Sequence, residues 1–489
     1  MSLKEPAKIA AACRHYAMCK IDYLGTGICP SACDKPYVAY YPQGRMDIYD
    51  ALAKKLIPVT EALVDIARSC NLCGICDMQC HFVTELRPVK VMQALKAHVE
   101  EHLVRKGKVV RVKEDAVLRG LRKIVGKEYA TNDPAILVTY ANDPFPLADM
   151  QMPRYVVLPQ STQEVAEIVT LANRRAVPYA VRGNGGRVFG FVFTNGIVVD
   201  TNRMKGMEID PGNWTVTVEA GVTSYELQQE VSKRGFRVNV AEPAATHVGN
   251  IVCTGIFSTW SASYGTAADN FVSAEFVDRE GNVFSSNDKS APNIFAFRHN
   301  VISSPGICTK AVVRMHPVTD DEEGLLVPLS DFEEAVSLAR TLSVRRLGLA
   351  IGVLGGHYLS TFISPSTRLA DQTKAFLADV LGIKYAVFVI GDRFARSAIR
   401  TLAPAVIDQK TLTSLMLGLP RLLEHDICQL IQGLEGDRPP YELLCKEEVQ
   451  PLLETVLSPS PAMLAGALDE DLRPWYERLY ARSEMTDMV

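Results

Sequence analysis

The 489-residue sequence lacks the features that would send a protein to a membrane or out of the cell. No apolar run approaches the ~20 residues that a transmembrane helix requires. The first residues, MSLKEPAKIAAACRHY, show neither the apolar core nor the cleavage pattern of a secretory signal peptide. The net charge of −4 at pH 7 gives no reason to expect a nucleic acid as partner. These absences predict a cytoplasmic protein without a membrane span, in a reducing compartment where free thiols persist.

Short-period repeats and low-complexity tracts are absent too, so the length favours roughly two to four compact domains. Cysteine, in contrast, is concentrated, because eight of the twelve cysteines fall within the first 80 residues. The other four are scattered and are expected to be small core residues: Cys253, Cys308, Cys428 and Cys445. The dense N-terminal group is therefore where chemistry is expected.

The second half of this group is a C-x2-C-x2-C-x3-C run made of Cys70, Cys73, Cys76 and Cys80. This spacing is that of bacterial ferredoxins, in which four thiolates hold one cubane [4Fe-4S] cluster. A zinc site more often pairs two C-x2-C knuckles across a longer gap, and a disulfide framework suits a small secreted domain. The run therefore predicts an iron–sulfur cluster, with electron transfer as the first functional hypothesis.

The first half of the group has the looser spacing C-x5-C-x9-C-x3-C and consists of Cys13, Cys19, Cys29 and Cys33. Partly buried, inert thiols are the alternative, but eight cysteines in so short a stretch favour a second cluster. In two-cluster ferredoxins the fourth cysteine of each run ligates the other cluster. On that pattern Cys33 completes the downstream cluster and Cys80 the upstream one. Two simple quartets are the alternative, and both arrangements use the same eight ligands.

The remaining patterns divide the chain into four segments and predict a multidomain α+β protein. These are a helical iron–sulfur segment 1–125, a linker 126–150 rich in Pro, Asn and Asp, a strand-and-helix segment 151–318, and a smaller α+β segment 319–489 with a helical tail. Two hairpins are expected in the third segment, one around Asn195-Gly196 and one within residues 273–286.

A glycine-rich loop, VRGNGGRVFG at 181–190, follows an expected strand. Gly183, Gly185 and Gly186 permit positive φ angles and a close approach of the backbone. Successive amides in such a loop form a concave anion site suited to a pyrophosphate. No long helix begins directly after the loop, so it is not the dinucleotide-binding loop of a Rossmann fold.

In seven ordered fragments, residues 152–318 resemble the FAD-binding domain of the vanillyl-alcohol oxidase and p-cresol methylhydroxylase (PCMH) flavoprotein family. The fragments are PRYVVLPQSTQEVAEIVTLAN, AVRGNGG, NGIVVDTNRM, EAGVTSYELQQEV, EPAATHVGNIVCTG, YGTAADNFVSAEFVDREG and SPGICTKAVVRMHP. The nearest likeness is to the FAD subunits of glycolate and D-lactate dehydrogenases. The resemblance implies a two-part α+β PCMH-type FAD domain at 151–318 and a cap-like domain at 319–489.

The resemblance also implies which residues hold FAD. The diphosphate loop is Arg182, Gly183, Asn184, Gly185 and Gly186; the second flavin loop contributes Thr246, Gly249, Asn250, Thr254 and Gly255; further positions are Asp269, Gly306 and Ile307. Some family variants attach FAD covalently through histidine, for which His247 is the candidate here. A neutral histidine lining the site is the alternative.

The run CNLCGICDMQCHFVTELRPVKVMQAL resembles the helical ferredoxin domains of the glycolate oxidase iron–sulfur subunit and the heterodisulfide reductase C subunit. It departs from them at His81, where a proline is usual. The dehydrogenases also carry a GHxGDGN-type motif late in the cap, which binds metal and substrate. This sequence has no such motif, so no catalytic residue is assigned.

Together these features predict an FAD- and iron–sulfur-dependent oxidoreductase. It is expected to pass electrons between an organic acid at the flavin, such as a 2-hydroxy acid, and an external carrier through two [4Fe-4S] clusters. Ferredoxin, a quinone and a disulfide reductase-like protein are the expected kinds of carrier. The alternative is a non-catalytic electron-transfer subunit of a larger redox complex, relaying electrons between FAD and partner subunits.

Overall fold

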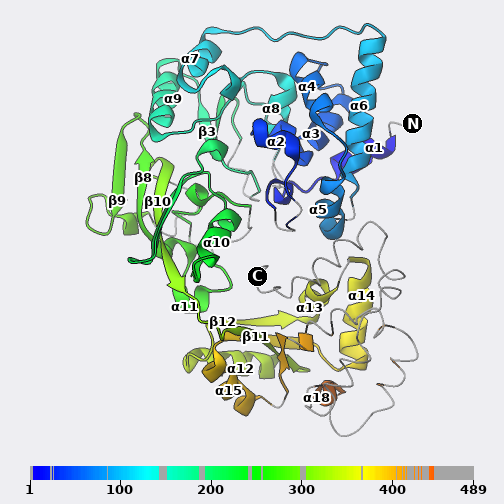
Figure 1. Ribbon diagram of the computed structural model, residues 1–489, viewed down its shortest axis with the longest axis vertical. Helices are drawn as coiled ribbons and strands as arrows, with labels where there is room; N and C mark the ends of the chain where they lie inside the picture. Colours follow the sequence, from blue (N-terminus) through cyan, green and yellow to red (C-terminus); the bar gives the residue numbers. More distant parts are fainter. Residues whose placement is uncertain are drawn as a thin grey trace. The chain divides into compact units, whose positions relative to one another are not determined.

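The computed structural model divides the chain into two compact units (Figure 1). The first comprises Met1–His81, Leu86–Ser258 and Thr266–Pro317, and the second Phe82–Glu85, Thr259–Gly265 and Val318–Val489. The structure describes residues 4–22, 25, 27–84, 86–142, 151–186, 193–240, 245–254, 257–297, 304–364, 367–403, 405–409, 411–412, 415, 423, 428, 431 and 440–444.

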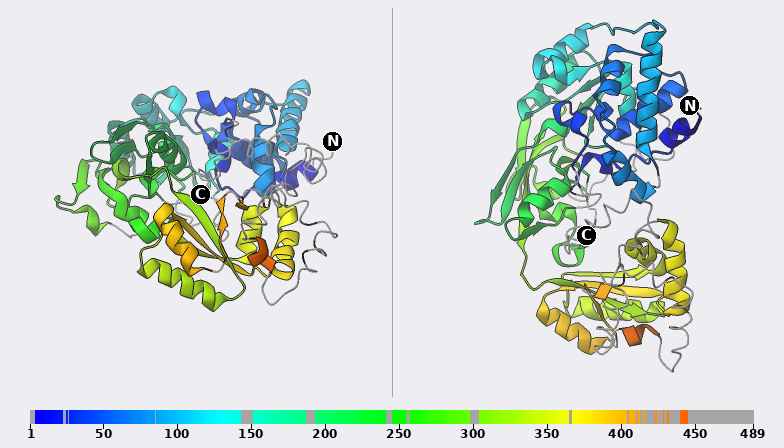
Figure 2. Two further views of the ribbon diagram at one scale, coloured as in Figure 1. Left: turned by 60° about the horizontal axis from the view of Figure 1, so that its bottom comes forward. Right: turned by 45° about the vertical axis from the view of Figure 1, so that its right-hand side comes forward.

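The N-terminal region is helical, as expected from its apolar spacing. Its helices are α1 (Lys4–Ala11), α2 (Pro30–Asp34), α3 (Pro42–Ala53), α4 (Glu61–Ser69), α5 (Ile75–Thr84) and α6 (Pro88–Val104). Helices α1, α3 and α6 pack against one another (Figure 2). Thr60 caps α4, because its Oγ1 accepts a hydrogen bond from the Leu63 amide at 3.1 Å. The cysteines thus lie in loops and on the short helices α2 and α5 around a packed helical core.

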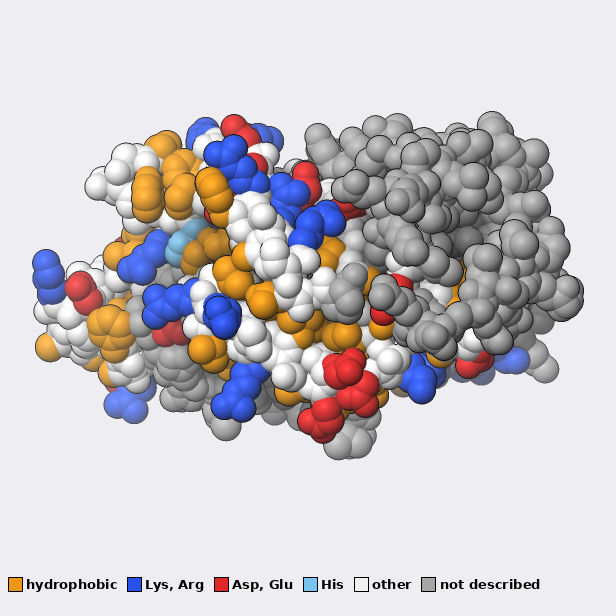
Figure 3. All heavy atoms as spheres, turned by 90° about the horizontal axis from the view of Figure 1, so that it is seen from below, with side chains coloured by type: hydrophobic (Ala, Val, Ile, Leu, Met, Phe, Trp, Pro, Cys, Tyr) orange, Lys and Arg blue, Asp and Glu red, His pale blue; other side chains and the backbone are white. Residues whose placement is uncertain are grey.

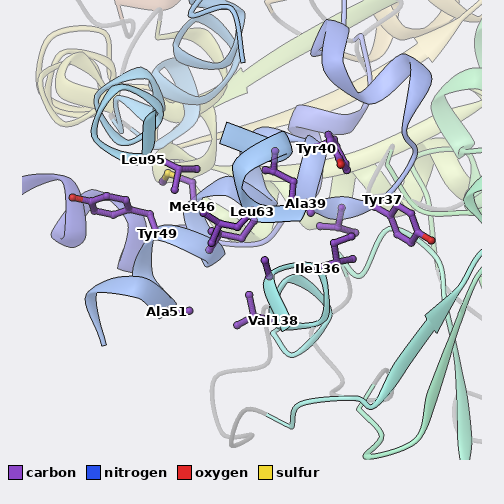
Figure 4. Packing of buried hydrophobic residues seen from close by; sticks show 14 of the residues in the cluster. Tyr37, Ala39, Tyr40, Met46, Tyr49, Ala51, Leu63, Leu95, Ile136 and Val138 are labelled. Atoms are coloured by element: carbon purple, nitrogen blue, oxygen red, sulfur yellow. The ribbon is translucent and has the colours of Figure 1, made fainter. Parts of the chain in front are cut away.

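Residues 135–138 and Tyr140, within the range 126–150 where a linker is expected, are part of this core. Strand β1 (Ala130–Thr131) and helix α8 (Pro134–Leu137) fall within that range. Figure 4 shows Ile136 and Val138 among the buried side chains of the helical core. The turn residues of this range border a short apolar run, and burial of that run outweighs the local loop signals. Residues 143–150 lie outside the described part.

A parallel sheet follows, in which β2 (Tyr155–Val157), β4 (Ile197–Asp200) and β3 (Tyr179–Arg182) lie side by side, with β1 antiparallel at the edge of β2. Helices α7 (Ala116–Val125) and α9 (Thr162–Arg174) cover one face. Along β2 and β4, side chains point alternately to the two faces of the sheet. On one face they pack in the core with α7 and α9, and on the other they pack in the N-terminal helical core. The sheet is therefore buried on both faces, as parallel sheets usually are.

The hairpin expected around Asn195-Gly196 is not formed, because β4 pairs in parallel with both β2 and β3. Gly196 instead allows a close backbone approach, since a side chain there would overlap the carbonyl of Pro178. The carbonyl of Gly196 accepts hydrogen bonds from the amides of Arg154 and Tyr155. The glycine thus serves a tertiary contact and not a turn between neighbouring strands.

The second sheet of the first unit is antiparallel, in the order β5-β6-β10-β8-β9, with β7 also paired to β10. Its strands are β5 (Met207–Asp210), β6 (Thr215–Glu219), β7 (Phe236–Val238), β8 (Phe271–Val277), β9 (Val283–Asn287) and β10 (Ile307–Pro317). The expected hairpin is formed by β8 and β9, with Phe276 paired to Phe284. Helix α10 (Ser224–Ser232) begins at a capping box of Thr223 and Glu226. Two sheets with helices give the mixed α+β architecture.

The second unit is a sheet between two helical layers. The antiparallel order is β12-β13-β11-β14, with strands β11 (Glu323–Leu329), β12 (Ala350–Gly355), β13 (Tyr385–Gly391) and β14 (Ile407–Asp408). The helices are α11 (Ser261–Tyr264), α12 (Phe332–Val344), α13 (Gly356–Ile363), α14 (Thr367–Ala375), α15 (Arg393–Leu402) and α18 (Pro440–Leu444). Leu325 and Val327 face the core under α12 and α15, whereas Leu326 faces the core that includes α13.

The outer surfaces of α12 and α15 carry exposed Phe332, Val344 and Phe394. On the face drawn in Figure 3, hydrophobic side chains are interspersed with lysines and arginines. Across the residues that the structure describes, no helix combines the length and the apolar character needed to cross a membrane.

Candidate functional site

The glycine loop begins where β3 ends, at Arg182, and turns sharply through Gly185, whose φ is +67°. A side chain at Gly183 would overlap Asn250 and His247, and one at Gly185 would overlap the Arg182 guanidinium. A Cβ at Gly186 would lie 3.0 Å from the carbonyl oxygen of Tyr16. The loop is therefore enclosed by neighbours, and glycine is required for the close approach.

The second expected flavin loop lies directly against the first. Asn184 Nδ2 donates to the carbonyl of Ala245 at 2.8 Å, and Gly183 approaches Asn250. Thr246 is buried, and its carbonyl accepts the Ser224 amide at 2.9 Å. Thr254 is buried too and donates to the Ile251 carbonyl at 3.0 Å. The structure thus brings two segments about sixty residues apart in sequence into one site; Gly249 packs closely on Ala220, and Gly255 lies outside the described residues.

Buried charges underlie the glycine loop. Arg182 is fully buried and donates to the carbonyls of Thr139 at 3.2 Å and Asn142 at 3.3 Å. Its guanidinium also lies 5.0 Å from the centre of the Tyr140 ring. The Tyr140 hydroxyl donates to Asp200 Oδ2 at 2.7 Å, and burial raises the pKa of that carboxyl.

Lys20, from the cysteine-rich segment, reaches this loop. Its Nζ donates to the Asn184 carbonyl at 2.9 Å, and the side chain is buried. Burial, with the nearby charge of Arg182 second, lowers the pKa of Lys20 to about 8. Tyr16 and Ala17, four and three residues before it, pack on Gly186. The segment between Cys13 and Cys19 thus touches the expected flavin site directly.

His247 has no exposed surface and shares a hydrogen bond of 2.9 Å between its Nδ1 and Thr201 Oγ1. Burial, with Lys205 and Lys20 adding repulsion, holds the pKa of this imidazole well below its ordinary value, so the ring is neutral. Within the described residues, neither His247 Nε2 nor Arg182 Nε has a hydrogen-bond partner. Buried polar atoms without partners are costly, and a bound polar group at the glycine loop would satisfy them. The residues present therefore fit an FAD diphosphate site.

Three expected flavin residues have other contacts. Asp269 Oδ2 accepts from the Thr266 amide and hydroxyl, both at 2.8 Å, and so caps a short helix. Gly306 leaves no room for a side chain against the carbonyl of Val277, and Ile307 pairs with Val277 at the start of β10. The contacts described for these residues support the second sheet.

Four cysteines line one hollow of about 440 Å³, part of which is open to solvent. They are Cys29, Cys70, Cys73 and Cys76. The chain turns between the last three through Leu72 at φ +59° and Gly74 at φ +86°. Arg45 also lines the hollow. The C-x2-C-x2-C trio thus lies around one hollow with Cys29 of the upstream group.

Cys33, which the crossed pattern places in this hollow, is exposed, with its Sγ 4.0 Å from the carbonyl of Cys29. Burial raises the pKa of Cys13, and charges on Asp47, Cys19 and Cys80 add to the shift. Burial likewise raises the pKa of Cys19 to about 11, with Cys80 among the neighbours that contribute. Cys80 thus lies close enough to Cys13 and Cys19 to affect the pKa of both. The chain between Cys29 and Cys33 turns through α2, and of these two cysteines only Cys29 lines the hollow.

All eight cysteines are free thiols. Over the ranges that the structure describes, no three Cys, His, Asp or Glu side chains converge as a single metal ion would require. In a cluster each thiolate binds a different iron, so four sulfurs around a hollow suit a cluster better than one ion. The Cys29 set therefore fits an iron–sulfur cluster.

Sequence reasoning missed Lys20, Arg45 and the pair of Tyr140 and Asp200. Each is a polar side chain buried far from its partner along the chain, and no short motif marks it. The only available signal was tyrosine, since six of the seventeen tyrosines fall within the first 80 residues.

The comparisons with known proteins agree with the glycine-loop site. Residues 153–287 match the family described as the FAD binding domain. D-lactate dehydrogenase of Archaeoglobus fulgidus is 29% identical over 205 residues, 40% of this chain and 46% of that protein. Glycolate oxidase subunit GlcD of Bacillus subtilis is 24% identical over 233 residues, 46% of this chain and 49% of that protein. The chain spans about half the length of these curated relatives.

Solved structures share the fold. Alkyldihydroxyacetonephosphate synthase matches with a TM-score of 0.53 at 19% identity, over 62% of this chain and 61% of that chain. p-Cresol methylhydroxylase matches with a TM-score of 0.50 at 14% identity, over 67% of this chain and 70% of that chain. Residues 153–287 therefore match an FAD binding domain, and the chain shares its fold with these flavoprotein structures.

Proposed function

We propose that the protein is an FAD- and iron–sulfur-dependent oxidoreductase, which passes electrons between an organic acid at the flavin and an external carrier through two clusters. The observation that carries this proposal is the bond from Lys20 Nζ to the Asn184 carbonyl, at 2.9 Å. Lys20 follows Cys19 directly, and Asn184 belongs to the glycine loop. A residue adjacent to an expected cluster ligand therefore hydrogen-bonds directly to the expected flavin loop. This contact between the two regions suits electron exchange between their cofactors.

When bound, FAD accepts two electrons from an organic substrate, and iron–sulfur clusters carry electrons one at a time. The protein's own part is to bind and orient these groups. The amides of Gly183 to Gly186 and the buried cations Lys20 and Arg182 would hold the diphosphate. Cys29, Cys70, Cys73 and Cys76 would hold one cluster, and Cys13, Cys19 and Cys80 would contribute to the other.

A small 2-hydroxy acid is the substrate class that we propose. The relatives named D-lactate dehydrogenase and glycolate oxidase subunit support this class. The external carrier would be a ferredoxin, a quinone or a disulfide reductase-like protein, reached in the cytoplasm.

Anaerobic reduction of the flavin tests this proposal. The FAD- and iron-loaded protein is mixed with D-lactate, L-lactate or glycolate, and the visible flavin absorbance is followed together with the electron paramagnetic resonance (EPR) of reduced clusters. We expect one acid to bleach the flavin, with cluster signals appearing afterwards. A loaded protein whose flavin no 2-hydroxy acid reduces would contradict the substrate assignment.

A second candidate function is an electron-transfer subunit without a substrate of its own. The absence of a GHxGDGN-type motif from the sequence favours it. Gly355 ends β12 and Gly356 begins α13, so the nearest sequence echo, Gly-Gly-His, is a strand-to-helix junction. In this case a partner protein, and none of the acids, reduces the flavin in the same experiment.

A further inference from the structure

Arg45 is a fully enclosed cation beside the cysteine hollow. It lies on α3 and is 1% exposed. All five of its N–H groups have acceptors. They are the carbonyls of Ile66 at 3.3 Å and Tyr40 at 2.8 Å, Ser31 Oγ at 2.6 Å, Ser69 Oγ at 2.9 Å and Cys29 Sγ at 3.4 Å.

No carboxylate is among these acceptors, and the described part of the chain shows no ion pair to Arg45. A guanidinium stays protonated in proteins, so its charge is buried without compensation from the protein side chains around it. Burial of an unpaired charge is strongly unfavourable. Cys29 is the only one of the five acceptors that can ionise, and it opens onto the hollow with three further cysteines. A group of negative charge in that hollow would complete the pair.

The guanidinium is also held in a fixed orientation. The Ser31 hydroxyl donates to the Tyr40 carbonyl at 3.0 Å, and the Ser69 hydroxyl donates to the Ile66 carbonyl at 2.9 Å. Each hydroxyl therefore turns a lone pair toward Arg45. Ser31 Oγ lies 3.2 Å from Cys29 Sγ as well, which ties the sulfur to the same network. The charge is thus organised before any cofactor binds.

We propose that Arg45 is the counter-charge of the cluster bound by Cys29, Cys70, Cys73 and Cys76, and that it raises the reduction potential of that cluster. The inference rests on the proposed function. Reduction adds one electron from the flavin to the cluster and breaks no bond. A fixed positive charge and an N–H···S hydrogen bond in a region of low dielectric constant stabilise the reduced, more negative form more than the oxidised form. Arg45 acts through Cys29 and is a positioning residue.

The test compares R45Q with wild type in an anaerobic potentiometric titration followed by EPR, with iron content measured on the same samples. We expect the equilibrium constant for one-electron reduction of this cluster to fall at least tenfold, about 59 mV for a one-electron couple. R68Q is the matched control, because Arg68 lies two residues before Cys70, has a side chain 58% exposed, and pairs with Glu100. Its loss should leave the potential unchanged, since exposed charges are screened.

The outcomes separate the inference from the function on which it rests. An R45Q protein with full iron and an unchanged potential overturns the role of Arg45, and an equal shift in R68Q does the same. A wild-type protein without iron instead overturns the proposed function.

A second measurement covers an R45Q protein that fails to retain iron. Wild-type and R45K proteins are labelled with 15N-arginine, and the reduced cluster is examined for hyperfine coupling to 15N. Coupling in wild type that is absent from R45K supports the inference. Absence of coupling from wild type, or its persistence in R45K, overturns it.

Discussion

At the scale of single residues, three buried cations lie at the two proposed cofactor sites. Lys20, Arg45 and Arg182 are buried, and their described hydrogen bonds go to carbonyls, hydroxyls and one sulfur, not to carboxylates. Burial of a positive charge is unfavourable unless an anion lies near it, and Asp200 is the nearby carboxyl that interacts with Lys20 and Arg182. A diphosphate and a thiolate-bound cluster are both anionic, so the same physical argument supports both sites.

Lys20 allows a direct test of the contact between the cysteine segment and the flavin loop. We expect K20M to weaken FAD binding about tenfold, because a hydrogen bond from a charged donor contributes roughly 1.5–3 kcal/mol. The dissociation constant is measured by adding FAD to the flavin-free protein and following fluorescence. K8M, which removes an exposed lysine of α1, is the control and should bind FAD like wild type. Unaltered FAD binding by K20M at full iron content would argue against the contact.

Cys29 and Cys33 distinguish the ligand set of the structure from that of the ferredoxin spacing. Two [4Fe-4S] clusters hold about eight irons, so loss of one leaves about four. We expect C29S to lose iron toward the lower value, because Cys29 lines the hollow with the downstream trio. C33S should keep the wild-type content, because Cys33 is exposed. Iron and acid-labile sulfide assays provide the measurement, and the reverse ranking of the two variants would restore the spacing-based assignment.

At the scale of elements, the sequence patterns correctly predicted those helices and strands whose formation depends on residues close together in the chain. The strand that ends in the glycine loop, the β8–β9 hairpin and the helix begun by Ser161 are formed as expected, and Ser161 Oγ accepts from the Glu164 amide at 3.2 Å. The features that the patterns did not predict depend on packing between segments that are distant in the sequence. Gly196 resembles a hairpin turn but serves a parallel strand, because Pro178 approaches it from another segment. The choice of Cys29 over Cys33 likewise depends on how α2 packs, which spacing does not encode.

Helix α7 offers a prediction at this scale. Asp115 Oδ1 accepts from the Leu118 amide at 2.9 Å, so D115A should cost about 1 kcal/mol of local stability. Burial raises the pKa of Asp115, but hydrogen bonds from Tyr155 and Leu118 outweigh it and hold the pKa below its ordinary value. A carboxyl whose pKa is lower in the folded state than in the unfolded state stabilises the folded protein at pH values above the unfolded-state pKa, about 3.9. This stabilisation is lost as the pH falls through the folded-state pKa.

Hydrogen exchange of the first α7 amides measures this effect as protection factors at pH 7 and below pH 4. The loss in D115A should be largest at pH 7 and should shrink in acid. D115N is the matched control, because asparagine caps helices as well as aspartate does. Equal protection in D115A and wild type at pH 7 would show that the cap is dispensable.

At the scale of the whole first unit, the helical cysteine region and the FAD-binding region share one core. Val156, Leu158 and Val198 of the parallel-sheet region belong to the same buried cluster as Leu63 and the other side chains of the N-terminal helices. The Tyr140 hydroxyl joins the two regions as well, since it accepts from the Val38 amide and donates to Asp200. Such a core holds the glycine loop and the cysteine region at a fixed separation, as the proposed electron exchange between them requires.

A chain shortened to residues 126–489 tests the shared core. Removal of the helices would expose Ile136, Tyr140, Val156 and Val198, each of which is at most 5% exposed in the full chain. Large apolar patches of this kind cause aggregation, so we expect the shortened chain to be insoluble or aggregated and to lack FAD. Size-exclusion chromatography and flavin absorbance provide the measurement. The full-length triple variant C70S/C73S/C76S is the control: it removes three of the proposed cluster ligands but keeps the helical core, and it should remain soluble and bind FAD. A monomeric 126–489 chain with bound FAD would mean instead that the FAD-binding region folds without the helices, as a linker at 126–150 would allow.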